Sequence, residues 1–400
     1  MREEDLGRLL TLAADEIRPE RPAAAGWERA RRLRRHRRAG VAAAVAVVLL
    51  TGGTVLTLRP ADPPAPTTPA TSTATTTSTV TPAPNASPVQ RPPTQLNYPG
   101  DPLGRLGDPV TASLSGRPVR QALALYQPID PETGAEGRIR VLGDDGLVRD
   151  LDVVTPARTR DASGNEAVAL KSGSLSPDGR LAAFAQTDEV IVVDLTTAQV
   201  RRYPLKGYLE HVLWAGDRLF VGDNDTTYEL DRRTGATRTV PLSPWELVVP
   251  DPAGRADALL ALGGLRDGLT LTRWTRSADG TDRGDRPLDL RALPAGNRVN
   301  EFYARGWQRG DEIAQAAWIT TGGMDGVEGV AVLDAETGVV TRLLDLGRDR
   351  WKGCCEVLGW DGDAVLLRHD PGGLLRWRPT TGEVTGVVRD LYGELSLAPR

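Results

Sequence analysis

Residue types that most often carry catalysis or hold metals are scarce in this sequence. Its 400 residues include three histidines and two cysteines. Histidine relays and zinc sites need several such side chains in one place, so His36, His211 and His369 leave little material for either. No Gly-x-Ser-x-Gly nucleophile motif follows a predicted strand. The composition therefore argues against an enzyme, and we expect neither a metal nor a cofactor.

Lysine is also rare, so arginine carries most of the positive charge. Lysine occurs at positions 171, 206 and 352 alone. The wealth of arginine and alanine is typical of a GC-rich genome such as that of an actinobacterium. The charge is unevenly divided, because residues 1–38 carry a net charge of +4 and the rest of the chain −8. This division indicates two environments rather than one surface.

Long apolar runs are missing too, with one exception. Residues 39–58, AGVAAAVAVVLLTGGTVLTL, carry no charge, and a helix of this length rises about 30 Å, the thickness of a bilayer's hydrocarbon core. Seven arginines lie between positions 29 and 38, whereas only Arg59 follows closely. Positive charge is retained on the cytoplasmic side, which predicts a single-pass transmembrane helix with the N-terminus inside. A cleaved signal peptide is the alternative, although the preceding head is long for one.

The segments on either side of this run differ in character. Residues 1–38 predict a cytoplasmic head with a short amphipathic helix and an arginine-rich stretch, which we interpret as a membrane flank rather than a nucleic-acid site. Residues 59–98 are dominated by Pro, Thr, Ser and Ala and cannot bury a core. We expect a disordered, extended stalk there, either bare or O-glycosylated. Residues 99–400 remain as the folded extracytoplasmic domain.

The folded part of the sequence is β-rich and repetitive. GYLEHVLWAGDRLFVGD at 207–223 and GCCEVLGWDGDAVLLRHD at 353–370 share Gly-x-x-Glu, Trp-x-Gly-Asp and an apolar strand, and LSPDGRLAAFA at 175–185 is a third copy. Each copy precedes a second hairpin, with Gly and Asp at the turns. We count six units of four strands over about 40–55 residues, the pattern of an all-β propeller. The ends, GDPVTASLSG and LYGELSLAPR, either close a sixth blade together or add a seventh.

One copy carries a family resemblance. LSPDGRLAAFA followed by VVDLTTAQ resembles the TolB-like and WD-repeat-like propellers, although the Gly-His and Trp-Asp dipeptides of the WD repeat are missing. The resemblance implies propeller architecture and no particular activity. Trp214, Trp307 and Trp360 recur at the same turn, which favours packing between blades over a sugar-binding platform.

Three charged or titratable residues are placed by the alignment near the mouth of the propeller's channel. Glu210 and Glu356 occupy equivalent positions at the start of innermost strands, and His211 follows Glu210. A carboxylate pair with a histidine is able to do acid–base chemistry or bind a divalent cation. Blade symmetry explains the repeated acids equally well, so we assign no catalytic or metal role. We predict that these residues, with Cys354 and Cys355, form a binding surface.

The only two cysteines are neighbours, Cys354 and Cys355, and align with Tyr208 and Leu209 of an earlier unit. They are predicted to lie outside the membrane, where disulfides persist, and within one molecule they pair only with each other. A strained vicinal disulfide is the favoured interpretation. The alternatives are two thiols, one buried and one exposed, and a redox- or ligand-responsive switch.

Two function classes remain. The first is a non-catalytic binding or scaffold module at the cell envelope, with an unknown extracytoplasmic protein or a cell-wall ligand as its partner and no nucleic acid. The second is a single-span regulator whose residues 1–38 control a cytoplasmic protein. The head and span resemble those of proteins found with extracytoplasmic-function sigma factors, although the His-x-x-x-Cys-x-x-Cys zinc motif is missing. A propeller enzyme of lactonase or lyase type is the third possibility, disfavoured by the scarcity of histidine.

Overall fold

The computed structural model describes residues 87–161, 164, 166–223, 226–252, 258–264, 268–277, 280–347, 355–369 and 372–398. The predicted head, the predicted span and most of the predicted stalk lie outside these ranges. Within them, no helix is both long enough and apolar enough to cross a membrane. The described residues belong to one compact unit that begins at Ala83.

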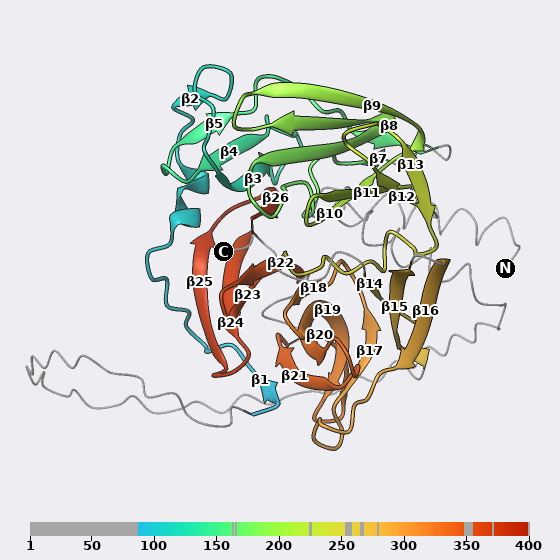
Figure 1. Ribbon diagram of the computed structural model, residues 1–400. Helices are drawn as coiled ribbons and strands as arrows, with labels where there is room; N and C mark the ends of the chain where they lie inside the picture. The colour runs from blue at the N-terminus through green and yellow to red at the C-terminus, as the bar shows by residue number, and fades with distance from the viewer. Residues whose placement is uncertain are drawn as a thin grey trace, which may run out of the picture. The chain divides into compact units, whose positions relative to one another are not determined.

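The regular structure is almost entirely β-sheet, as the sequence predicts, and five sheets follow one another around a ring (Figure 1). The first sheet contains β26 (Gly393–Leu397), β3 (Ala122–Pro128), β4 (Arg140–Gly143), β5 (Val148–Asp150) and β2 (Ala112–Ser113). The second contains β10 (His211–Ala215), β11 (Arg218–Gly222), β12 (Thr227–Leu230) and β13 (Thr237–Val240). The third contains β14 (Ala258–Gly263), β15 (Thr270–Ser277) and β16 (Gly280–Pro287).

The remaining sheets complete the ring. The fourth contains β17 (Arg298–Phe302), β18 (Trp307–Arg309), β19 (Glu312–Thr321), β20 (Met324–Asp334), β21 (Val340–Asp345) and β1 (Val89–Gln90). The fifth contains β22 (Glu356–Asp361), β23 (Ala364–His369), β24 (Gly373–Arg378) and β25 (Glu383–Arg389). Two smaller sheets pair β6 (Thr159–Arg160) with β7 (Glu166–Ala167) and β8 (Leu181–Asp194) with β9 (Gln199–Tyr208). One 3-10 turn, η1 (Pro102–Gly107), lies between β1 and β2 in the chain.

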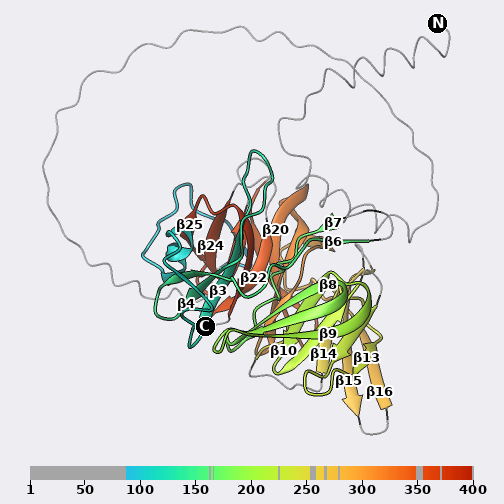
Figure 2. The same ribbon diagram turned by 90° about the horizontal axis from the view of Figure 1, so that it is seen from above.

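The structure is thus a β-propeller with five blades, and the predicted number of six or seven is wrong. The difference lies at residues 175–208, which the repeat predicted to be a four-stranded unit. There β8 pairs with β9 in a two-stranded sheet, and the inner stretch contributes one isolated bridge, Leu175↔Ala182. The ends of β8 meet, since the Leu195 amide donates to the Arg180 carbonyl oxygen at 2.8 Å. β8 therefore folds back on itself, so the two separate strands expected are joined in one element, and Figure 2 shows β8 and β9 next to β10.

The ring closes where the two ends of the propeller sequence meet. β26 pairs antiparallel with β3, from Gly393↔Pro128 to Leu397↔Ala124. β2 pairs in parallel with β5 at the other edge of the same sheet. Both end segments noted in the sequence therefore lie in one blade, so the last inner strand fastens the ring to the first blade.

The recurring tryptophans pack between neighbouring units, as predicted. Trp214 Nε1 donates to the Ser174 carbonyl oxygen at 3.1 Å, and Trp360 Nε1 donates to the Trp307 carbonyl oxygen at 2.8 Å. Each indole thus reaches the inner stretch of the unit before it. Trp307 itself is buried in an apolar cluster that draws on the second to fifth sheets. The burial of large apolar side chains such as these indoles supplies most of the stability of a fold of this kind.

An N-terminal segment runs along the outer edges of three blades; we call residues 87–113 the strap. Its first strand, β1, joins β21 in parallel, and its last, β2, joins β5. Between them, Gln90 Oε1 accepts a hydrogen bond from Trp377 Nε1 of the fifth blade at 2.6 Å. The Asn97 carbonyl oxygen accepts one from the Gly386 amide of β25 at 2.8 Å. Residues 87–98 fall in the range predicted to be disordered, but they belong to the propeller.

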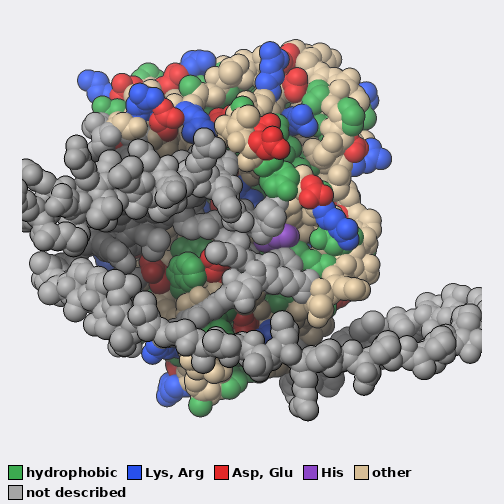
Figure 3. Space-filling view, turned by 180° about the vertical axis from the view of Figure 1, so that it is seen from behind, with side chains coloured by type: hydrophobic (Ala, Val, Ile, Leu, Met, Phe, Trp, Pro, Cys, Tyr) green, Lys and Arg blue, Asp and Glu red, His purple; other side chains and the backbone are tan. Residues whose placement is uncertain are grey.

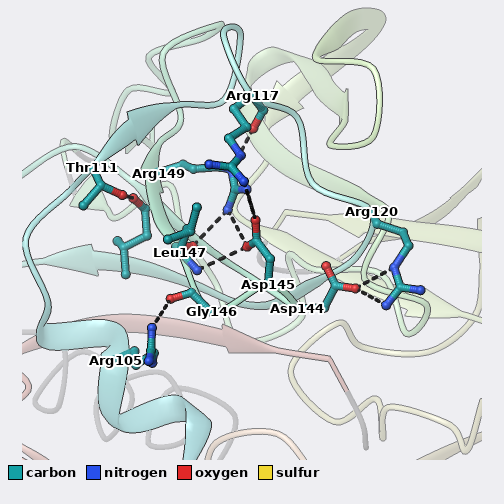
Figure 4. Close-up of polar contacts among 10 residues, drawn as sticks. Arg105, Thr111, Arg117, Arg120, Asp144, Asp145, Gly146, Leu147 and Arg149 are labelled. Carbon is teal, nitrogen blue, oxygen red and sulfur yellow. Dashed lines mark hydrogen bonds and ion pairs between the residues drawn. The ribbon is translucent and has the colours of Figure 1, made fainter.

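A nearly buried arginine holds the hairpin between β4 and β5 (Figure 4). The Arg149 side chain is 1% exposed and makes two hydrogen bonds to the Asp145 carboxylate, at 2.6 and 3.0 Å. It also donates to the carbonyl oxygens of Arg117 and Leu147. These hydrogen bonds from Arg149 lower the pKa of Asp145 to about 2. The buried charge is therefore fully paired, as buried charges must be.

Candidate functional site

Glu210 and His211 lie at the start of β10, as the alignment predicts, and both side chains are buried. His211 Nε2 lies 3.5 Å from Glu210 Oε1. The imidazole also packs edge-on against Trp245, with ring centroids 4.2 Å apart. Burial lowers the pKa of His211 to about 4, although the neighbouring Glu210 opposes the shift. The imidazole is therefore neutral at pH 7.

Arg305 reaches this pair from the fourth blade. It lies in the link between β17 and β18, and its Nη1 donates to the Val212 carbonyl oxygen of β10. Gly173 provides the space, because a Cβ there would lie 2.5 Å from the Val212 oxygen and 2.8 Å from Arg305 Nη1. Burial lowers the pKa of Arg305 to about 10, against the attraction of Glu356. The guanidinium stays charged at pH 7, and its charge further disfavours protonation of His211.

Glu356 begins β22, equivalent in sequence to Glu210, but its surroundings differ. Its Oε2 accepts a hydrogen bond from Arg368 Nη2 at 2.7 Å. Arg368 Nη1 donates in turn to Glu394 Oε2 at 2.8 Å and to the Gly393 carbonyl oxygen at 2.7 Å. Arg368 therefore fastens the fifth blade to the closing strand β26. The equivalent glutamates have separate roles, one beside a histidine and one in an ion-paired network.

The inner edges of successive units hold one another and so fix these side chains in place. Ser396 Oγ of β26 accepts from the Leu175 amide at 2.8 Å and donates to the Ser172 carbonyl oxygen at 2.7 Å. The Val249 amide donates to the Gly306 carbonyl oxygen at 2.8 Å, next to Arg305. We call Glu210, His211, Arg305, Glu356 and Arg368 the axial cluster. His211, Glu356 and Arg368 lie on strands, whereas Arg305 lies in the link between β17 and β18.

The two arginines of the axial cluster were missed at the level of the sequence. Arg305 immediately precedes GWQRGDEIAQAAWI, one of the looser copies of the repeat, and Arg368 ends an apolar strand in the last copy. A lone arginine at a blade's inner edge is a usable signal. It is hidden here because arginine is abundant throughout the chain.

Cys355 is a free, buried thiol, so the predicted vicinal disulfide is wrong. Its Sγ donates to the Gly329 carbonyl oxygen at 3.5 Å and lies 3.7 Å from Tyr303 Oη. The equivalent residue in the second blade, Leu209, is fully buried, and Cys355 packs in the same way as a small apolar side chain. Cys354 lies outside the described residues. Cys355 is therefore a core residue rather than part of an exposed surface.

The described residues offer no obvious place for a metal ion. Within them, no three His, Cys, Asp or Glu side chains are grouped in a way that could hold one. Around the axis, Glu356 is neutralised by Arg368. The negative charge of the Glu356 carboxylate is therefore balanced by an arginine of the protein itself.

A second polar region, which the sequence did not predict, lies on the outer part of the second blade. An open groove of about 690 Å³ is lined there by residues of β9, β11, β12 and β13 and of the turn between β12 and β13. Eight of its side chains are charged: Arg201, Asp217, Arg218, Glu229, Asp231, Arg232, Arg233 and Arg238. We call it the arginine groove. Figure 3 shows that elsewhere, too, basic and acidic side chains lie interspersed on the surface.

No protein family model matches this sequence, and no characterised protein is similar to it in sequence. Among solved structures, the chain is similar to BamB from Moraxella catarrhalis, with 15% identity over 66% of this chain and 77% of that chain and a TM-score of 0.33. A nidogen/laminin complex is similar at 11% identity, covering 69% and 99%, with a TM-score of 0.42. The N-terminal domain of Nup159 is similar at 10% identity, covering 78% and 88%, with a TM-score of 0.37. Similarities this distant concern the fold alone.

Proposed function

We propose that this chain is a membrane-anchored, extracytoplasmic β-propeller that acts as a non-catalytic binding or scaffold module at the cell envelope. In this proposal residues 39–58 cross the membrane, residues 1–38 remain in the cytoplasm, and the propeller faces outward. The strap supports the proposal, because it fastens the N-terminal end of the described chain to the fourth and fifth blades.

The observation that carries the binding role is the exposure of Tyr208 beside the axial cluster. In the described part of the chain, two large hydrophobic side chains are exposed, Tyr208 at 45% and Met324 at 53%. Tyr208 ends β9 and precedes Glu210 by two residues. Exposed aromatic side chains next to fixed polar groups are the usual anchors of binding surfaces. Glu210 and His211 are themselves buried, so Tyr208 is the side chain that a partner would reach here.

Site-specific cross-linking in the native membrane tests this proposal. A photoreactive amino acid replaces Tyr208 in one version of the full chain and Met324 in the other, and adducts are analysed by gel and mass spectrometry. We expect a discrete adduct with one envelope component, protein or glycan, from position 208 and none from position 324. The absence of an adduct at position 208, or the same adducts at both positions, would overturn the binding role.

A further inference from the structure

We propose that the arginine groove, together with the open edge of β13, binds an acidic, extended peptide segment of a partner protein. This goes beyond the proposed function, because the groove is separate from Tyr208 and the axial cluster and concerns a different face of the second blade. The peptide lies along β13 as an added strand, and its carboxylates contact the guanidinium groups of the groove.

The carboxylates inside the groove are largely occupied by internal contacts. Glu229 accepts a hydrogen bond from Arg218 Nε at 2.7 Å and pairs with Arg238 on its other oxygen. Asp231 is engaged by its own turn, where it accepts from the Arg233 amide at 2.8 Å. These contacts lower the pKa values of both carboxylates. They remain ionised and hold the floor of the groove in place.

Three arginines of the groove form no ion pair with a carboxylate of the described residues. Arg232 donates its Nε and Nη2 to the carbonyl oxygen of Asp217, at 3.1 and 3.0 Å, and stacks over Trp214 at 5.2 Å. A carbonyl oxygen orients this guanidinium without cancelling its charge. Arg201 and Arg233 are exposed and make no ion pair with another described residue. The lining as a whole has five arginines and three acids, although residues 39–400 carry a net charge of −8.

An extended peptide fits better than a compact anion because the groove borders a strand with an unused edge. β13 hydrogen-bonds to β12 on one side, and no other described strand pairs with it. Thr237 and Arg238 of β13 line the groove. An edge strand offers a row of unpaired amide and carbonyl groups, which an extended peptide satisfies by strand addition.

The propeller already accepts added strands in this way. Two other blades each carry an added, parallel strand at the outer edge, where β1 lies on β21 and β2 lies on β5. Both added strands come from the strap, and neither is part of the up-and-down order of its blade. The outer edge of a blade in this molecule therefore has the geometry to receive a strand, and β13 is such an edge without one.

Fluorescence anisotropy with defined peptides tests the inference on the full chain in detergent. The probe is a labelled ten-residue peptide of alternating Glu and Val, which is acidic and strand-forming. Three matched ligands are compared with it: the same peptide with alternate backbone amides N-methylated, the Lys–Val peptide, and inorganic polyphosphate as competitor. The variant Arg201→Glu/Arg233→Glu is compared with Arg180→Glu, which changes an exposed arginine outside the groove.

The inference predicts that the Glu–Val peptide binds and that the Lys–Val peptide does not. N-methylation should weaken binding at least tenfold, because it removes the backbone hydrogen bonds. Arg201→Glu/Arg233→Glu should also weaken binding at least tenfold, and Arg180→Glu should leave it unchanged. Equal binding of the N-methylated peptide, or tight binding of polyphosphate without the peptide, overturns the inference. Equal losses in both arginine variants overturn it as well. The cross-linking result at Tyr208 is independent of all these outcomes.

Discussion

At the scale of single residues, buried arginines are the most demanding feature of this propeller. Arg149 is removed from water and Arg305 is partly buried, and each is held by neighbouring groups that receive its N–H donors. Arg149 has a carboxylate partner, whereas the hydrogen bond of Arg305 goes to a backbone oxygen. Changes to the surroundings of these two arginines should therefore cost more than changes to surface arginines.

The partner of Arg149 provides the first prediction. Asp145→Asn removes the charge opposite a guanidinium that is 1% exposed, which should lower the free energy of unfolding by about 1–3 kcal/mol. Asp145 is itself 37% exposed, so solvent screening keeps the loss below that of a fully buried pair. Because its folded pKa is about 2 rather than 3.8, this contribution is present above pH 4 and lost as the pH falls toward 2. Denaturant unfolding at several pH values measures it.

The neighbouring residue is the matched control. Asp144 pairs with Arg120, whose side chain is 85% exposed. Asp144→Asn should cost less than about 1 kcal/mol. Equal losses in the two variants would show that burial of Arg149 does not set the energy of its pair.

A second prediction concerns the space occupied by Arg305. Gly173→Ala would place a Cβ 2.5 Å from a backbone oxygen, which has no freedom to move aside. Overpacking of this kind costs about 1–3 kcal/mol, and the melting temperature should fall accordingly. Gly104→Ala is the control, because nothing lies within 4 Å of a Cβ there. If Gly173→Ala leaves the melting temperature unchanged, the position of the Arg305 side chain does not depend on the space at Gly173.

At the scale of elements, the strap is the feature that the sequence did not predict. Segments rich in proline form few hydrogen bonds of their own, so their order depends on what they dock against. Residues 87–98 are as rich in proline as the stalk before them. Their contacts with Trp377 and Gly386 arise from residues almost three hundred positions away. Amino-acid composition alone does not predict such long-range contacts.

The docking of the strap gives a third prediction. Gln90→Ala removes the acceptor of the buried Trp377 indole N–H and the donor to the Pro379 carbonyl oxygen. Leaving these groups unsatisfied should lower the free energy of unfolding by about 1–3 kcal/mol. Ser87→Ala, at the exposed start of the strap, should change it by less than about 0.5 kcal/mol. Thermal unfolding of both variants distinguishes them. If Gln90→Ala is as stable as the parent, the strap adds nothing to the propeller.

The repeat predicted the blades more reliably than the surroundings of individual residues. Alternating strands and turn residues are local signals, and they correctly place Glu210 and Glu356 at the starts of β10 and β22. Which further groups these positions meet depends on side chains from other blades, such as Arg305 at β10 and Glu394 at Arg368. The same limit explains Cys355. Its equivalence to the buried Leu209 pointed to a core position, while its neighbour Cys354 pointed to a disulfide.

At the scale of the whole molecule, burial of His211 should make stability depend on pH. The folded pKa is about 4, below the ordinary 6.5, so between these values the unfolded chain binds a proton that the folded chain does not. Stability should therefore be fully retained above pH 6.5 and decrease by up to about 3 kcal/mol as the pH falls to 4. His211→Phe should flatten this part of the profile. An unchanged profile for His211→Phe would assign the dependence to other groups.

The last prediction concerns the membrane topology proposed for the full chain. In it the basic head lies inside, the apolar run crosses the membrane, and the propeller lies outside. Positive charge before residue 39 and the acidic balance after it favour an N-terminus inside and a propeller outside. Protease added to intact spheroplasts should cut the Pro/Thr-rich segment and release the propeller, while an N-terminal epitope tag stays with the membrane. The tag should be digested only after the membrane is opened with detergent. Loss of the tag from intact spheroplasts would reverse the orientation, and a soluble propeller before protease is added would indicate a cleaved signal peptide.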